Sequence, residues 1–135
     1  MKLRCANCGE TTQKWIYATT LELKDVKGGR GKAHLVVKCK LCGRENNLQI
    51  LEDLIRPYSE SEKFQTIVVF ECRGLEPVEF DPRGGWTAVG VDSGTKFLDV
   101  DLSQKEWSDY DERAQQPVSI LDISSRFIKI ARPPP

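Results

Sequence analysis

Short apolar runs, many of them alternating with polar residues, recur along this chain about every ten residues. Such alternation is typical of strands that bury one face, and the glycine and proline clusters between the runs favour turns. The pattern predicts an all-β, single-domain fold, a sandwich or a barrel-like assembly. The predicted strands are residues 14–23, 33–38, 47–51, 64–71, 86–91, 95–100, 118–123 and 126–130.

Helix should be a minor component. Ser103 and Glu106 stand at capping-box spacing, which predicts a short helix over residues 103–115 that ends before Pro117. Around residues 51–55, a helical turn and a continuation of the preceding strand both agree with the pattern.

Length and composition fit one soluble domain. The chain has 135 residues, 39% of them hydrophobic, which suffices for one core and is too little for two independent ones. We expect a cysteine-bearing part at about 1–50, a main β part at about 51–131 and a frayed tail at 132–135. No run approaches the roughly 20 apolar residues of a membrane span, and no secretory pattern begins the chain. We therefore expect an intracellular protein, cytoplasmic or nuclear.

Two matched cysteine motifs carry the clearest chemistry. Both have the form C-x-x-C followed by glycine, and they span residues 5–9 and 39–43. Two intervening residues let both sulfurs of a motif face one ion, and two such motifs complete a tetrahedral shell. Thirty residues separate the motifs, but each doubling of a loop costs only about 0.6 kcal/mol. The predicted ligands of one Zn²⁺ per chain are Cys5, Cys8, Cys39 and Cys42.

Redox dithiols are the alternative interpretation of these motifs. Thioredoxin-like proteins carry one C-x-x-C near a βαβ unit, and the pattern predicts no such unit. A disulfide framework fits poorly because five cysteines cannot all pair. Four thiolates leave no metal position for water or substrate, so we expect a structural zinc and predict no catalytic residue.

Further segments are distinctive together with the two motifs. They are Lys14-Trp15 and the segments 27–31, 38–46, 70–78 and 107–112. With the motifs, they resemble the eukaryotic CXXC-motif-containing zinc-binding protein family over nearly the whole chain. The resemblance implies a β-rich domain with one zinc at the four cysteines, in a family whose biochemical role is largely unassigned.

The N-terminus departs from that family. Its members carry an extra, strand-forming segment before the first C-x-x-C, whereas only Met1 to Arg4 precede Cys5 here. We expect a truncated or alternative form, in which a sheet edge that this segment would cover is open.

Charge divides the chain into two halves. Residues 1–56 hold 11 Lys and Arg against 6 Asp and Glu, residues 57–135 hold 9 against 14, and the net charge is zero. A zero net charge argues against a dedicated nucleic-acid binder. Opposite charges gathered in separate halves favour contact with a protein partner.

One basic and one acidic segment are candidate contact surfaces. The glycine-rich loop from Lys24 to Lys32 fails the P-loop template, because Val26 and Ala33 stand where glycine and Ser or Thr belong. We expect it to form the tip of a projecting hairpin.

The acidic segment runs from Asp99 to Glu112. It fails the calcium-loop pattern, because Gln104 and Tyr110 replace the required glycine and glutamate. An acidic surface anchored by Trp107 and Tyr110 remains.

The fifth cysteine and the single histidine have ordinary interpretations. Cys72 follows an apolar run, which is typical of a small buried hydrophobic residue. A nucleophilic pair of Cys72 and His34 is the alternative, although nothing local orients it. Trp15, Trp86 and Trp107 fall in separate segments, which favours core or partial-core anchors over a base-stacking platform.

These features predict a non-enzymatic adaptor, a monomer whose zinc fixes a scaffold for a protein partner. Metal handling, in which the thiolates exchange zinc or copper, is the first alternative. RNA binding in the manner of a ribosomal zinc ribbon and thiol redox chemistry rest on weaker signals.

One zinc per chain should accompany the protein purified without added metal, because two motifs supply one tetrahedral shell. Elemental analysis measures this ratio. A ratio near zero or near two would contradict the prediction, as would a Cys5→Ser, Cys8→Ser variant with unchanged thermal stability.

Overall fold

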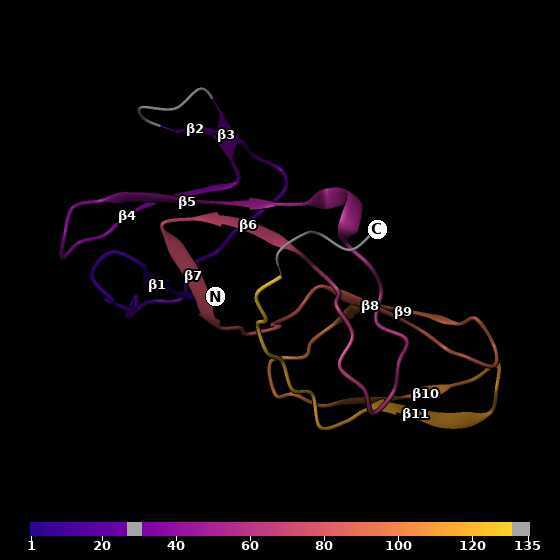
Figure 1. Ribbon diagram of the computed structural model, residues 1–135. Helices are drawn as coiled ribbons and strands as arrows, with labels where there is room; N and C mark the ends of the chain where they lie inside the picture. The colour runs from indigo at the N-terminus through magenta and orange to yellow at the C-terminus, as the bar shows by residue number, and fades with distance from the viewer. Residues whose placement is uncertain (27–30, 131–135) are drawn as a thin grey trace. The chain divides into compact units, whose positions relative to one another are not determined.

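The predicted all-β class is confirmed by a computed structural model that describes residues 1–26 and 31–130 (Figure 1). Apart from one 3₁₀ turn, η1 (Glu52–Leu54), the regular structure of these residues is β. The strands pair in small antiparallel sheets, and none of the described sheets closes into a barrel. They are β1 (Lys2–Cys5), β2 (Lys24–Asp25), β3 (Lys32–Ala33), β4 (Leu35–Lys38), β5 (Glu45–Ile50), β6 (Phe70–Arg73), β7 (Leu75–Glu79), β8 (Trp86–Val89), β9 (Lys96–Val100), β10 (Trp107–Asp111) and β11 (Gln116–Ile120).

The chain divides into two compact units. Of the described residues, the first contains Met1–Phe80 and 126–130, and the second contains Asp81–Ser125. The boundary expected near residue 50 falls inside the first unit. Whether both units unfold together as a single domain stays a prediction.

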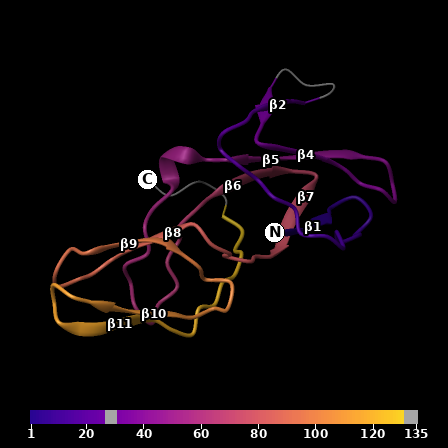
Figure 2. The same cartoon turned by 180° about the vertical axis from the view of Figure 1, so that it is seen from behind.

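Two sheets of the first unit meet at a corner. Strands β4, β5 and β6 form a three-stranded sheet, and β7 pairs with β1. Gly74 alone separates β6 from β7 and has a φ of 80°, and both views show the chain turning sharply there (Figures 1 and 2). Glycine adopts this backbone conformation without a steric cost.

The core of the first unit follows the alternation of β5. Asn46, Leu48 and Ile50 are buried on one face of this strand. The two apolar residues cluster with Leu3, Leu35 and Leu75. Burial of each leucine contributes about 1.5–3 kcal/mol, so this cluster holds β1, β4, β5 and β7 together.

The predicted projecting hairpin is present at its base. Strands β2 and β3 pair through Lys24 with Ala33 and Asp25 with Lys32, and they extend away from the three-stranded sheet (Figures 1 and 2). The cations Lys27 and Arg30 lie outside the described residues.

The strand predicted over residues 14–23 is wrong. The backbone N–H of Thr12 donates to the Leu3 carbonyl at 2.8 Å, and that of Ile16 donates to the Met1 carbonyl at 2.7 Å. These isolated bonds run along the edge of β1 without forming a ladder. They cover part of that edge, and the expectation of an open sheet edge stays a prediction.

The strand predicted over residues 126–130 is also wrong. Side chains hold this segment, because the Phe127 ring lies 6.4 Å from the Phe70 ring and Lys129 Nζ lies 3.5 Å from Glu76 Oε2. The strand predicted from residue 64 begins only at Phe70. The other predicted strands are present with shifted ends.

The second unit contains two antiparallel hairpins. Strand β8 pairs with β9, and β10 pairs with β11. The Phe97 and Trp107 rings meet edge to face at 5.2 Å. Val100 and Leu102 are buried.

The helix predicted over residues 103–115 is wrong, since β10 occupies its middle. The turn after Leu102 stops at Lys105, whose φ of 61° lies outside the helical region. Trp107 then enters β10 opposite Ile120. Tertiary packing of Trp107 on Phe97 therefore overrides the local capping signal.

A buried carboxylate ties the two hairpins of the second unit. Asp111 is 1% exposed and accepts hydrogen bonds from the Ser93 and Thr95 hydroxyls and from the backbone N–H groups of Arg113 and Ala114. The Ser93 hydroxyl and these other donors hold the pKa of Asp111 below its usual value. This carboxylate is structural, contrary to its assignment to the acidic surface.

Within residues 1–26 and 31–130, no helix has the length and apolar character needed to cross a bilayer.

Replacing Asp111 with alanine should lower the thermal midpoint by more than about 5 °C, because four donors lose their acceptor. Circular dichroism measures the midpoint, and Asp109→Ala, an exposed neighbour on β10, is the control. Because the folded pKa is lowered, the stabilisation is complete above the unfolded value of 3.8 and is lost as the pH falls below it. An equal midpoint for Asp111→Ala and Asp109→Ala would contradict the structural role.

Candidate metal centre

The four predicted cysteine sulfurs come together in the first unit. They lie within 4.8 Å of one another, with Cys5 Sγ 3.8 Å from Cys42 Sγ and Cys8 Sγ 3.5 Å from Cys39 Sγ. In a tetrahedral shell with metal–sulfur bonds of about 2.3 Å, neighbouring sulfurs are about 3.8 Å apart. The four cysteines are thus positioned to hold one metal ion.

The two motifs have the same backbone geometry. In each, the first cysteine donates its N–H to the carbonyl five residues on, and the closing glycine donates to the first cysteine's carbonyl, all at 2.8 Å. Gly9 and Gly43 have φ values of 79° and 77°, which glycine adopts without strain. Each turn therefore presents its two sulfurs to a common point because its sequence allows this closure.

Strand ends deliver the two motifs to the same place. Cys5 ends β1 and stands opposite Leu75 of β7, and Cys39 directly follows β4. The first cysteine of each motif is buried and the second is exposed. The cluster therefore has a buried side against the sheets and a side open to solvent.

The thiols of the cluster differ widely in acidity. Hydrogen bonds from the Cys8 backbone N–H and the Asn46 amide lower the pKa of Cys5 to about 6. The Glu10 backbone N–H lowers the pKa of Cys8, but desolvation and the neighbouring thiols prevail and raise it to about 12. The Asn7 side chain and the Arg44 backbone N–H lower the pKa of Cys42. One thiolate forms readily, whereas four require a cation among them.

Donor groups around the sulfurs fit that requirement. Asn46 is 3% exposed, and its Nδ2 lies 3.5 Å from Cys5 Sγ. Arg44 Nη1 donates to Asn7 Oδ1 at 3.3 Å and so links the two motifs. Amide and backbone N–H donors next to sulfur suit thiolate ligands of a metal such as zinc.

Asn46 and Gly74 were not predicted as part of the site. A Cβ at Gly74 would lie 2.2 Å from Asn46 Oδ1, so only glycine leaves room for the amide. The available signal was an asparagine at a core-facing position of β5, two residues before Leu48.

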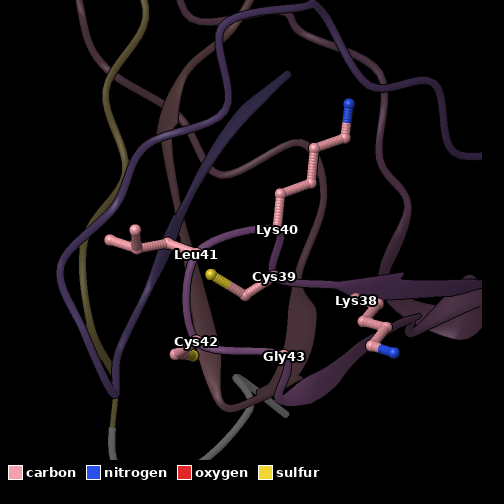
Figure 3. Close-up of a pocket in the computed structure, with 6 residues that line it drawn as sticks. All are labelled: Lys38, Cys39, Lys40, Leu41, Cys42 and Gly43. Atoms are coloured by element: carbon pink, nitrogen blue, oxygen red, sulfur yellow. The ribbon is translucent and has the colours of Figure 1, made fainter.

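A shallow depression of about 560 Å³ lies over the second motif and is lined by residues 38–43 (Figure 3). Lys38 and Lys40 point away from the Cys39 and Cys42 sulfurs (Figure 3). Leu41, at the tip of the motif, is 68% exposed. This surface presents one exposed apolar side chain and two cations.

Cys72 lies in β6, whereas His34 lies in the bend between β3 and β4. Cys72 of β6 stands opposite Leu48 and packs against the core, as predicted for a small hydrophobic residue. The buried His34 accepts the Ile50 backbone N–H at Nδ1, at 2.9 Å. No hydrogen bond joins Cys72 to His34 among the described residues, so the structure does not orient a nucleophilic pair.

The tryptophans agree only in part with the expected core anchors. Trp86 and Trp107 are partly buried, but Trp15 is 46% exposed and carries Lys2 Nζ 5.1 Å above its ring. Trp15 is therefore not a core anchor, and its half-buried ring agrees with the partial-core alternative.

Sequence comparisons agree over nearly the whole chain. The profile of the eukaryotic CXXC motif containing zinc binding proteins matches residues 1–128. The CXXC motif containing zinc binding protein of Homo sapiens is 51% identical over 131 residues, which cover 96% of this chain and 82% of that protein. A UPF0587 protein of Nematostella vectensis is 54% identical over 132 residues, with the same two coverages.

Solved structures share the fold. The crystal structure of C1orf123 has a TM-score of 0.91 and 51% identity, and the match covers 96% of this chain and 82% of that one. A hypothetical protein from Plasmodium falciparum has a TM-score of 0.78 at 23% identity, with coverages of 89% and 78%. The second likeness concerns the fold alone.

Alkylation of Cys72 by iodoacetamide at pH 8 should be about 100-fold slower in the folded protein than in urea. Burial, followed by the charges of Glu71 and Glu76, raises the pKa of this thiol to about 11, so little thiolate exists until the pH approaches that value. Mass spectrometry of the Cys72 peptide measures both rates. Equal rates in the folded and unfolded protein would contradict the prediction.

Proposed function

This chain belongs to the eukaryotic family of CXXC motif containing zinc binding proteins, and from that premise we propose that it is a non-enzymatic, intracellular adaptor with one structural zinc per chain. Cys5, Cys8, Cys39 and Cys42 would hold the ion. Zinc, when bound, supplies four metal–sulfur bonds that fix the two motifs. The chain's own residues then present the binding surface.

The closed donor set is the observation that carries this proposal. Four thiolates within 4.8 Å of one another fill a tetrahedral shell. A catalytic zinc keeps one position for water or substrate, and this donor set supplies a protein sulfur there instead. The site therefore suits a scaffold better than a reaction.

Two exposed surfaces suit a protein partner. Lys24 and Lys32 are exposed on β2 and β3 of the first unit. Asp109 and Glu112 are exposed in the second unit, and Tyr110, which lies between them in sequence, is half exposed. Charged and aromatic side chains of this kind steer and anchor protein association. From here on, the basic surface means Lys24 and Lys32, and the acidic surface means Asp109, Tyr110 and Glu112.

Metal handling is a second candidate, favoured by the exposure of Cys8 and Cys42. An incoming thiolate could bind the ion from this exposed side and displace the two cysteine sulfurs from it one at a time. Zinc transfer to a thiol-rich acceptor separates the two functions. An adaptor should lose zinc no faster to the acceptor than to buffer, whereas a metal-handling protein should lose it faster as the acceptor concentration rises.

Reversing charge on either surface should weaken capture of the partner about fivefold, since two exposed ion pairs contribute about 0.5 kcal/mol each. The variants are Lys24→Glu with Lys32→Glu, and Asp109→Lys with Glu112→Lys. Quantitative affinity capture from cell extract at several salt concentrations measures the effect, and thermal midpoints confirm that each variant is folded.

A reversal of Asp53 and Glu60 to lysine makes the same charge change as the acidic pair, at exposed positions of the first unit. It should leave capture unchanged. If capture survives both surface reversals, the contact surface lies elsewhere and the adaptor proposal fails in this form. Loss of capture in Cys39→Ser, Cys42→Ser would in addition show that binding depends on the metal site.

A further inference from the structure

We propose that Asn46 is a positioning residue of the metal centre, one that donates its amide N–H to the Cys5 thiolate and thereby retains the metal. The inference rests on the proposed zinc site. It assigns a role to a residue outside the two C-x-x-C motifs.

The position of Asn46 in β5 makes the residue unusual. Asn46, Leu48 and Ile50 share the buried face of the strand, and the other two are apolar. An amide at such a position costs free energy unless it is hydrogen-bonded. Its Nδ2 lies 3.5 Å from Cys5 Sγ, a sulfur that is itself buried. The amide therefore reaches a ligand atom that water cannot easily solvate.

The other end of the amide has no partner. Among the described residues, Asn46 Oδ1 is the buried side-chain oxygen or nitrogen that lacks a hydrogen bond. A Cβ at Gly74 would come within 2.2 Å of this oxygen, so the glycine leaves the space that the oxygen occupies. An amide placed for the fold alone would have both ends bonded, or would be an apolar residue. The unpaired oxygen is tolerated because the N–H faces sulfur.

The opposite amide orientation is disfavoured by electrostatics. It would aim the lone pairs of Oδ1 at a thiolate, and two acceptors repel each other. With Nδ2 toward Cys5, the N–H stabilises the thiolate more than the neutral thiol, and the thiolate is the form that binds metal. Removing such outer partners typically lowers metal affinity 10- to 100-fold.

Asn7 offers a comparison within the same cluster. Its side chain hydrogen-bonds to Cys42, but both residues are exposed. Water can replace a lost donor at Cys42, whereas no solvent reaches Cys5 to the same extent. The buried donor should therefore matter more than the exposed one.

The test replaces Asn46 with leucine, which has nearly the same shape and no donor. Asn47→Leu, the next residue of β5 on the opposite face, is the matched control. Competition with a chromogenic chelator at pH 7.4 measures zinc affinity. Cobalt substitution gives the energy of the sulfur-to-metal charge-transfer band, and thermal unfolding with excess chelator gives the stability of the metal-free chain.

Asn46→Leu should bind zinc about 10- to 100-fold more weakly than wild type. Its charge-transfer band should move to longer wavelength, because a sulfur without its hydrogen bond gives up an electron more readily. Stability with chelator should be unchanged or higher, since leucine also removes the unpaired oxygen. Asn47→Leu should match wild type in affinity and band position.

Unchanged affinity and band position in Asn46→Leu would overturn the proposal, whatever the thermal stability. Asn46→Asp, which replaces the donor with an acceptor, serves as the second variant and should lose more affinity than leucine. If neither variant folds with excess zinc while Asn47→Leu does, Asn46 is required for the fold and the proposal is wrong. A wild-type protein that binds neither zinc nor cobalt would refute the proposed function itself, an outcome distinct from the others.

Discussion

Mutual repulsion of four thiolates is the constraint on which the first unit depends. At separations near 4 Å and an effective dielectric constant of about 20, each pair of unit charges repels by about 4 kcal/mol. The summed repulsion of six such pairs exceeds the stabilisation from burying the core leucines, which is about 1.5–3 kcal/mol each. The same conflict acts at Cys8: the Glu10 backbone N–H lowers the pKa of this thiol, but desolvation and the neighbouring thiols outweigh it and raise the pKa to about 12. A divalent cation offsets this repulsion, and the apparent binding free energy of structural zinc is roughly 10–16 kcal/mol.

The cluster also determines how the sheets of this unit are joined. Cys5 ends β1, Cys39 follows β4, and a bound ion would fix these two strand ends to each other. The Gly74 carbonyl accepts the Ala6 N–H at 2.9 Å, which brings the corner between β6 and β7 beside the first motif. Both sheets therefore meet at the candidate metal centre. A substitution at the corner should then shift the positions of the cysteine sulfurs.

Two buried polar side chains show different uses of polarity in this chain. Asp111 has a donor for each of its oxygens, several of them local in sequence, and it holds turns of the second unit together. Asn46 has one partner, a cysteine sulfur 41 residues away, and one unpaired oxygen. The burial of Asp111, whose oxygens are all hydrogen-bonded, is explained by the fold. A half-bonded group next to a metal-binding cluster is explained by the site.

The sequence by itself determined the features that depend on local spacing. Two residues between cysteines and a glycine after them specify the motifs, and alternation of polar and apolar residues identified most strands, including those at residues 33–38, 47–51 and 95–100. Tertiary structure decided what depends on distant partners. Residues 103–115 form a turn and a strand because Trp107 packs on Phe97. Asp111 is buried because the Ser93 and Thr95 hydroxyls donate to it. Asn46 is part of the site because β1 ends beside it and places Cys5 within reach of its amide. Local sequence cannot encode these outcomes, because each of them depends on which segments the fold places in contact.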